Sequence, residues 1–208
     1  MLKQTGIIDK NTKAFEIFNS QISDNFLEIS NMNPSEYVCY CWSRYESYRD
    51  ENKGMMSDNA WNSMNGNVFE LVIASEMYRQ GLCPMFLQAK VAFVPNVNFD
   101  ILLYTSENFP IGISLKTSLR ERYKQADLEA TALKYVHRRA RNYLITLGEG
   151  EARSAKNKVI TGDVLGLDDV ILADKEEFDA LIASLRQMNF IKPDKIEIVS
   201  AATVVERI

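Results

Sequence analysis

The chain has 208 residues, 46% of them apolar and 25% charged, which is ordinary for a globular domain and excludes a disordered or fibrous protein. No segment is apolar enough over sufficient length to cross a bilayer, and the first residues lack the hydrophobic core of a signal peptide. We therefore expect one cytoplasmic domain. Three cysteines, at positions 39, 41 and 83, are too few and wrongly spaced for a zinc site or a disulfide framework, so we expect buried thiols.

The distribution of charge is more informative than its sum. The formal net charge is −4, but the segment from Lys116 to Arg141 holds eight Lys or Arg and three Asp or Glu, so it carries +5 and the remainder −9. Such a basic stripe is typical either of a local nucleic-acid contact or of the solvated face of one helix. The only histidine, His137, excludes the histidine clusters of zinc enzymes and HNH-type nucleases, and we expect it at the surface or at a helix end.

The first sixty residues predict a helical lobe. Apolar residues recur at helical intervals over 14–30 and 34–49, and a polar stretch over 50–54 then interrupts the pattern. Four aromatic residues, Trp42, Tyr45, Tyr48 and Trp61, have helical spacing. This spacing favours a core or an interface between subunits over base stacking.

The rest of the chain predicts a mixed sheet with helices on both sides, an α/β fold. We expect helices over 67–79, 125–140 and 176–188, and strands over 88–94, 99–104, 111–117, 142–147, 164–172 and 195–199. The first of these helices buries Phe69, Val72, Ile73 and Met77. Glu70 lies in its apolar opening turn, where it is either a charge that complements the helix dipole or a carboxylate directed at a neighbouring site.

Two charged residues interrupt apolar strands, Asp100 in the strand over 99–104 and Lys116 in the strand over 111–117. Burying a charge is costly unless the charge is paired or binds a metal. Because side chains alternate along a strand, Ser114 and Lys116 share one face, opposite Ile113 and Leu115. The pattern predicts either a salt bridge across a hairpin or an acidic metal site beside a lysine.

Phosphodiester hydrolysis with Mg²⁺ needs one or two carboxylate ligands and a group that serves the attacking water. Asp100 can supply one ligand and Lys116 can orient or deprotonate water, while Ser114 can orient water but brings no charge. A second carboxylate must come from elsewhere. Glu129, thirteen residues after Lys116 and near the start of the next helix, is placed to return toward the end of the strand.

This ordered set resembles the PD-(D/E)xK nuclease superfamily, and more narrowly the type II restriction endonucleases that recognise sites built on CC and GG. That group has an aspartate, then S-x-K, then an R-(D/E)-R triplet four residues after the lysine, then a glutamate on the next helix. The corresponding residues here are Asp100, Ser114 and Lys116, then Arg120-Glu121-Arg122, then Glu129, so the resemblance spans about 70–129. A proline that often precedes the aspartate is replaced by Phe99.

The resemblance implies a restriction-endonuclease-like fold, with Asp100, Lys116, Glu129, Glu70 and Ser114 in the active site. Asp100 and Glu129 would hold Mg²⁺. It also implies that the triplet reads bases in double-stranded DNA: Arg120 and Arg122 can donate to guanine, and Glu121 can accept from cytosine. The plainer alternative for the triplet is a self-paired, exposed turn.

Three lysines, Lys124, Lys156 and Lys158, are expected to contact the DNA backbone, the last two in a polar loop over 153–158. Cutting both strands of a symmetric site needs two active sites, so the resemblance implies a homodimer or a tetramer and no membrane partner. We expect a single nuclease domain in which residues 1–60 form the helical lobe, for dimerisation or DNA contacts, and residues 61–208 form the catalytic core.

Two other functions fit the same residues. A nuclease of this superfamily that acts on damaged or branched DNA would use the triplet for phosphate contacts only. A protein of the same fold without catalytic activity would bind DNA and cut nothing, whether or not Mg²⁺ is present.

Overall fold

The computed structural model describes residues 1–94, 96–193, 199–200 and 203–206. Within these residues a seven-stranded mixed sheet has the order β5-β4-β3-β2-β1-β6, and β7 also pairs with β1. The strands are β1 (Met85–Val91), β2 (Phe99–Tyr104), β3 (Pro110–Lys116), β4 (Arg141–Thr146), β5 (Asp169–Leu172), β6 (Val199–Ser200) and β7 (Thr203–Val205). The α-helices are α1 (Lys13–Ile17), α2 (Pro34–Glu51), α3 (Asp58–Arg79), α4 (Arg122–Val136), α5 (Glu149–Thr161) and α6 (Glu176–Leu185).

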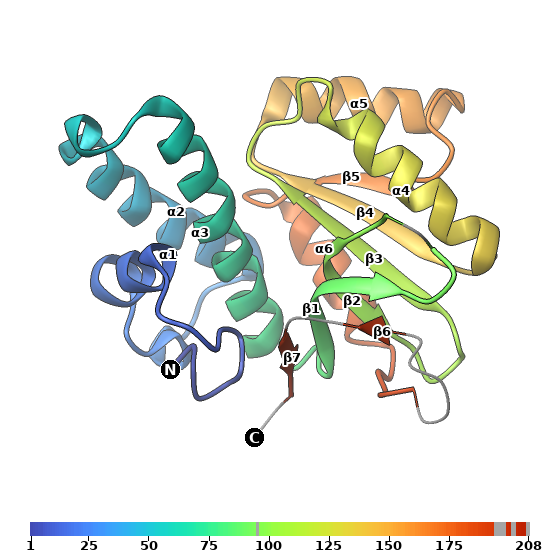
Figure 1. The fold of residues 1–208 in the computed structure, drawn as a ribbon, viewed down its shortest axis with the longest axis horizontal. Helices are drawn as coiled ribbons and strands as arrows, with labels where there is room; N and C mark the ends of the chain where they lie inside the picture. The colour runs from blue at the N-terminus through green and yellow to red at the C-terminus, as the bar shows by residue number, and fades with distance from the viewer. Residues whose placement is uncertain (95, 194–198, 201–202, 207–208) are drawn as a thin grey trace.

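The sheet combines an antiparallel meander with a parallel half. Strands β1, β2 and β3 pair in antiparallel fashion, whereas β3, β4 and β5 pair in parallel. Parallel neighbours need a crossover, and α4 and α5 provide the two crossovers. Figure 1 shows α4 and α5 together over one face of the sheet, with α6 behind it and α3 beside it. This confirms the expected mixed sheet with helices on both sides and a helical lobe at the amino terminus.

Each face of the sheet has its own apolar core. On one face the buried strand residues Ile101, Leu103, Ile113 and Leu115 pack with α3 and α6. On the other face Phe99, Leu102 and Leu133 form a cluster, and a further cluster joins α4 and α5 to β4 and β5. Ile113 and Leu115 thus lie where the strand alternation places them. Phe99 packs over Gly112, where a Cβ atom would lie only 2.7 Å from the ring.

The amino-terminal helix is shorter than the periodicity predicts. Thr12 caps α1, which ends at Ile17; a wider π-turn continues to Ile22, and a 3-10 turn spans Phe26–Glu28. Ser23 is extended and interrupts the helix, although Phe18, Ile22 and Phe26 are all buried as their spacing indicates. The helical spacing over 14–30 thus corresponds to three short helical segments and not to one helix, because burial periodicity does not reveal a local break.

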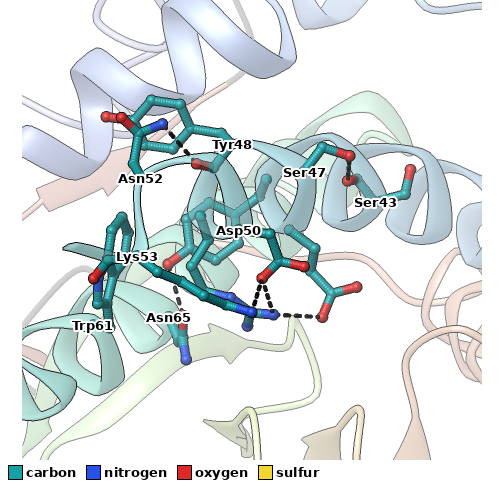
Figure 2. Close-up of polar contacts among 11 residues, drawn as sticks. Ser43, Ser47, Tyr48, Asp50, Asn52, Lys53, Trp61 and Asn65 are labelled. Atoms are coloured by element: carbon teal, nitrogen blue, oxygen red, sulfur yellow. Dashed lines mark hydrogen bonds and ion pairs between the residues drawn. The ribbon is translucent and has the colours of Figure 1, made fainter. Parts of the chain in front are cut away.

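The turn from α2 into α3 is closed by polar contacts (Figure 2). Asn52 donates its side-chain N–H to the Tyr48 carbonyl at 2.7 Å, and the Lys53 ammonium lies 3.2 Å from the Asp50 carboxylate. The Trp61 indole N–H donates to the Lys53 carbonyl at 3.2 Å. These bonds satisfy groups at the helix ends and account for the predicted break over 50–54.

The four aromatic residues of the lobe pack together and against α3. Tyr45 and Trp61 are buried, and Trp42 and Tyr48 are half-buried. Trp42 contacts the rings of Tyr45 and Phe69, with centroids 5.0 and 5.7 Å apart, and Tyr48 contacts Trp61 at 6.4 Å. Their main role is in the core of the lobe, the interpretation that their helical spacing favours.

Helix α3 begins at Asp58, nine residues before the predicted start, because Ser57 caps it through the N–H of Ala60. Strand β1 also begins three residues early, directly after the cis bond between Cys83 and Pro84. The expected strand over 164–172 is reduced to β5. Most of the expected strand over 195–199 lies outside the described residues.

Helix α5 was not predicted, and the expected polar loop over 153–158 is wrong. The buried side of α5 consists of the small residues Ala152 and Ala155, and Gly162 ends this helix with φ of 80°. Small apolar residues among charged ones produce little helical periodicity in the sequence. Lys156 and Lys158 are therefore residues of a helix packed on β5.

Two other expectations concern the burial of the cysteines and the position of the histidine. Cys41 is buried and Cys83 is half-buried, but Cys39 is exposed, so the expectation of buried thiols is wrong for Cys39. His137 is the C-cap of α4, as expected for a residue at a helix end. No α-helix in the described part of the chain meets the length and hydropathy needed to span a bilayer.

A buried carboxyl group near the end of α3 connects this helix to the lobe. Glu76 is fully buried and accepts hydrogen bonds from Arg79 and from Gln80. Arg79 also donates to the Ile29 carbonyl and stacks over the ring of Tyr37 at 4.3 Å. Burial raises the pKa of Glu76 to about 7, although Arg79 acts in the opposite direction.

This raised pKa predicts a loss of stability as pH rises. The folded protein retains a proton on Glu76 that the unfolded chain releases above the ordinary pKa of 4.5. The free energy of unfolding should therefore fall as pH rises from about 4.5 to 7, by on the order of 1 to 3 kcal/mol. Urea unfolding of wild type and Glu76→Gln at several pH values measures this effect, because glutamine does not titrate. A stability difference between the two proteins that stays constant with pH would contradict the prediction.

Candidate active site

Asp100 lies where the hairpin of β2 and β3 stops pairing. The ladder between these strands ends at the pair Ile101 and Ile113. Beyond that pair the Asp100 carboxylate takes the place of a strand carbonyl, since its Oδ2 accepts the N–H of Leu115 at 2.6 Å. The carboxylate is therefore held by the backbone of β3, close to the end of that strand.

Lys116, the last residue of β3, contacts the same carboxylate. Its Nζ lies 3.1 Å from Asp100 Oδ2, and only 22% and 12% of the two side chains are exposed. A partly buried pair of this kind is less screened by solvent than a surface pair. The expected proximity of a carboxylate and a lysine at the end of the hairpin is present.

Glu70 is the second carboxylate of this cluster. It lies well inside α3, so it is not a charge at the helix start, and Gln88 of β1 connects it to Asp100. The Nε2 of Gln88 donates to Glu70 Oε2 at 2.9 Å and lies 3.5 Å from Asp100 Oδ1. Three consecutive elements, α3, β1 and β2, thereby bring two carboxylates to one amide group.

The charge of Asp100 affects the pKa of the neighbouring Glu70. Burial raises the pKa of Glu70 to about 7, and the negative charge of Asp100 contributes further in the same direction. The hydrogen bond from Gln88 and the charge of Lys116 oppose this rise. A cation between the carboxylates would offset their repulsion.

The oxygen donors suit a hard divalent ion, since Mg²⁺ is commonly held by one or two carboxylates and waters. Glu70 and Asp100 also line a cavity of about 260 Å³ together with Asn67 and Gln88. Among the described residues no group of three or more His, Cys, Asp or Glu is arranged to hold a metal. The donor set thus fits an ion that binds two carboxylates and keeps several waters.

Glu129 and Ser114 are less closely connected to this cluster. Glu129 lies two turns into α4, is half-buried, and accepts a hydrogen bond from Gln125 at 2.8 Å. Ser114 is buried in β3, 5% exposed, and its hydroxyl forms no hydrogen bond with the described residues. The contacts that join Asp100, Lys116, Gln88 and Glu70 include neither residue.

The Arg120-Glu121-Arg122 triplet is exposed where the loop after β3 runs into α4, and Arg122 is the first residue of that helix. Glu121 pairs with Lys124, not with either arginine, and neither guanidinium forms an ion pair or hydrogen bond with any residue that the structure describes. The loop is anchored by the buried residue Leu119, whose N–H donates to Glu151 of α5 at 2.6 Å. Arg120 has φ of 41°, a left-handed conformation that is rare outside glycine. The triplet is therefore not a self-paired turn.

The three lysines expected to contact the DNA backbone differ in their exposure and in their partners. Lys124 is exposed and pairs with Glu121. Lys156 lies 3.2 Å from Asp169 and 2.6 Å from Glu177, and Lys158 donates to the Tyr123 hydroxyl at 2.6 Å. Each of the three lysines must give up a partner to contact a phosphate, but Lys124 is exposed whereas Lys156 and Lys158 are half-buried, so Lys124 is the best placed of the three.

Gln88 is the site residue that the sequence analysis missed. Gln88 is the first residue of the strand predicted over 88–94, and the residues next to it do not distinguish it from an ordinary polar residue at the end of a strand. A signal was present in the two amide residues, Gln88 and Asn98, which flank the turn leading to Asp100. Asn98 donates to Gln88 Oε1 at 2.7 Å.

Comparisons with known proteins bear on the fold. No protein-family model matches the chain, and no curated protein matches its sequence. A solved structure described as a restriction endonuclease PspGI-substrate DNA complex aligns with a TM-score of 0.54 and 15% identity, covering 83% of this chain and 76% of that one. The chain therefore has a restriction-endonuclease-like fold, as the resemblance in its motifs implies.

Proposed function

We propose that this protein is a type II restriction endonuclease, which hydrolyses double-stranded DNA with Mg²⁺ at a short palindrome containing CC and GG and leaves 5′-phosphates. The observation that carries the proposal is the contact of Lys116 with Asp100, beside Glu70, at the end of the central hairpin. The similar solved structure is that of a restriction endonuclease with its substrate DNA, which supports a nuclease acting on DNA.

In the proposed mechanism Glu70 and Asp100 would hold a divalent metal ion, which would supply activation of water and neutralisation of phosphate charge. Lys116 orients the attacking water and stabilises the negative charge that develops on the phosphate. The backbone N–H of Leu115 fixes the Asp100 carboxylate, and therefore the position of Lys116 relative to it. Glu129, as a metal ligand, and Ser114 enter the mechanism from the motif resemblance alone.

The exposed triplet is proposed to read the bases. Two unpaired guanidinium groups can each donate a forked pair of hydrogen bonds to guanine, while Glu121 accepts from cytosine once Lys124 turns to a phosphate. The loop connects directly to the strand that ends in Lys116, so only three residues separate the proposed catalytic lysine from the proposed reading triplet.

Arg120→Ala should lower the preference for the cognate site. The loss should be about 1 to 3 kcal/mol of discrimination, because one forked contact to a base disappears. Arg138→Ala is the matched control, since Arg138 is an exposed arginine of the same basic segment beyond the opposite end of α4. Competition binding with cognate and single-mismatch duplexes measures the preference. Equal losses in the two variants would show that Arg120 contributes charge and not base readout.

We further propose a homodimer, because a palindrome presents two equivalent strands to two equivalent active sites. The helical lobe of residues 1–60 is the proposed surface for it. Analytical ultracentrifugation with and without a cognate duplex tests this assembly. A protein that remains monomeric on DNA would contradict it.

The function itself is tested on unmethylated phage DNA with Mg²⁺, followed by sequencing of the fragment ends. A restriction endonuclease produces discrete bands and one recurring end sequence. A smear, or cutting only at junctions or lesions, would instead favour the damage- or structure-specific nuclease. DNA binding that is insensitive to Mg²⁺ and accompanied by no strand scission would favour a non-enzymatic binding protein.

A further inference from the structure

Gln88 has an unusual backbone for a glutamine in a strand. Its φ is 49°, in the left-handed region that side-chain-bearing residues rarely adopt. The ladder of β1 with β2 pairs Leu87 with Ile101 and Ala89 with Phe99 around it. Strain of this kind in an otherwise regular strand often accompanies a functional constraint on the side chain.

The side chain of Gln88 is oriented by its neighbours. Asn98 donates to Gln88 Oε1 at 2.7 Å, which leaves both N–H groups of Nε2 for other acceptors. These acceptors are Glu70 Oε2, at 2.9 Å, and Asp100 Oδ1, at 3.5 Å. The NH₂ group of the Gln88 side chain is therefore directed at both carboxylates.

On Asp100, the oxygen that Gln88 contacts is the one left for a metal. Asp100 Oδ2 is already engaged by the N–H of Leu115 and by Lys116. Its other oxygen, Oδ1, has only the longer contact with Gln88. An ion that binds Asp100 Oδ1 and Glu70 Oε2 therefore competes with the Gln88 amide for these two oxygens.

We propose that Gln88 is a positioning residue that stands in for the divalent ion in the metal-free protein, holding Glu70 and Asp100 together through its amide N–H groups. This inference rests on the proposed function, because it takes these two carboxylates as the metal ligands. When an ion binds, the hydrogen bonds from Gln88 are given up. Gln88 thus stabilises the metal-free arrangement of the two carboxylates and lowers the affinity of the site for the ion.

The test compares wild type with Gln88→Met, which keeps a side chain of similar length but has no N–H donor. Binding of Mn²⁺ to the DNA-free protein is followed by isothermal titration calorimetry, and thermal unfolding is recorded without metal. We expect Gln88→Met to unfold at a lower temperature without metal and to bind Mn²⁺ with a roughly tenfold lower dissociation constant. Gln187→Met, at an exposed glutamine after α6, should change neither quantity.

The sign of the affinity change separates this role from general damage. A variant that merely disturbs the site would bind Mn²⁺ more weakly, whereas removal of a competitor strengthens binding. Equal or weaker Mn²⁺ binding by Gln88→Met would overturn the inference while leaving the nuclease proposal in place. If neither wild type nor Gln88→Met binds Mn²⁺, and wild type cuts no DNA, the proposed function fails and the inference fails with it.

Discussion

Replacement of Lys116 by methionine is expected to reduce DNA cleavage by roughly 10² to 10³-fold and to leave DNA binding nearly unchanged. The ammonium lies 3.1 Å from Asp100 at the end of β3, where it can stabilise charge that exists only in the transition state. Cleavage of a labelled duplex under single-turnover conditions, and binding of the same duplex with Ca²⁺ in place of Mg²⁺, measure the two effects.

Two controls make the result specific to this position. Lys175→Met makes the same chemical change at an exposed lysine, the N-cap residue of α6, and should cut at the wild-type rate. Thermal unfolding of the Lys116 variant should remain cooperative, because Asp100 keeps its hydrogen bond from Leu115. Cleavage by Lys116→Met at a rate close to that of wild type would remove this lysine from the mechanism.

The second large effect is expected from the acidic residues, where Glu70→Gln and Glu129→Gln should differ. Both variants should lose cleavage, by roughly 10² to 10³-fold for Glu70→Gln. Only Glu70→Gln should weaken Mn²⁺ binding by the DNA-free protein. The reason is that Glu70 shares Gln88 with Asp100, whereas Glu129 bonds to Gln125 on its own helix.

Calorimetric titration with Mn²⁺ and single-turnover cleavage separate the two acids. If Glu129→Gln cuts DNA at the wild-type rate, Glu129 is not a ligand and the motif resemblance misassigned it. If Glu129→Gln weakens Mn²⁺ binding as much as Glu70→Gln does, Glu129 is also a ligand in the DNA-free protein, and the prediction that Glu70 alone joins Asp100 there is contradicted.

Much of the fold could be predicted because burial alternates along strands and recurs along helices. The hairpin of β2 and β3 is an example, since Ile113 and Leu115 face one core as their spacing indicates. Where the pattern is weak, the prediction failed. Helix α5 buries only Ala152 and Ala155, and α1 ends early because Ser23 adopts an extended backbone.

The sequence by itself determined the local parts of the candidate site. Neighbouring residues predict three features: the strand that ends in Lys116, the hairpin partner strand that contains Asp100, and the exposed triplet after Leu119. This is possible because strand geometry and turn formation depend on short separations in the chain. The resemblance to a group of nucleases depends on the same short spacings.

Only the tertiary structure decided which second carboxylate joins Asp100. Glu70 reaches it because α3 packs against the sheet beside β1, where Gln88 connects the two acids, while Glu129 bonds within α4. Likewise Lys156 and Lys158 acquire partners on β5, α6 and α4. Such pairings depend on how separate elements cross in space, and residue spacing along one element carries no information about that crossing.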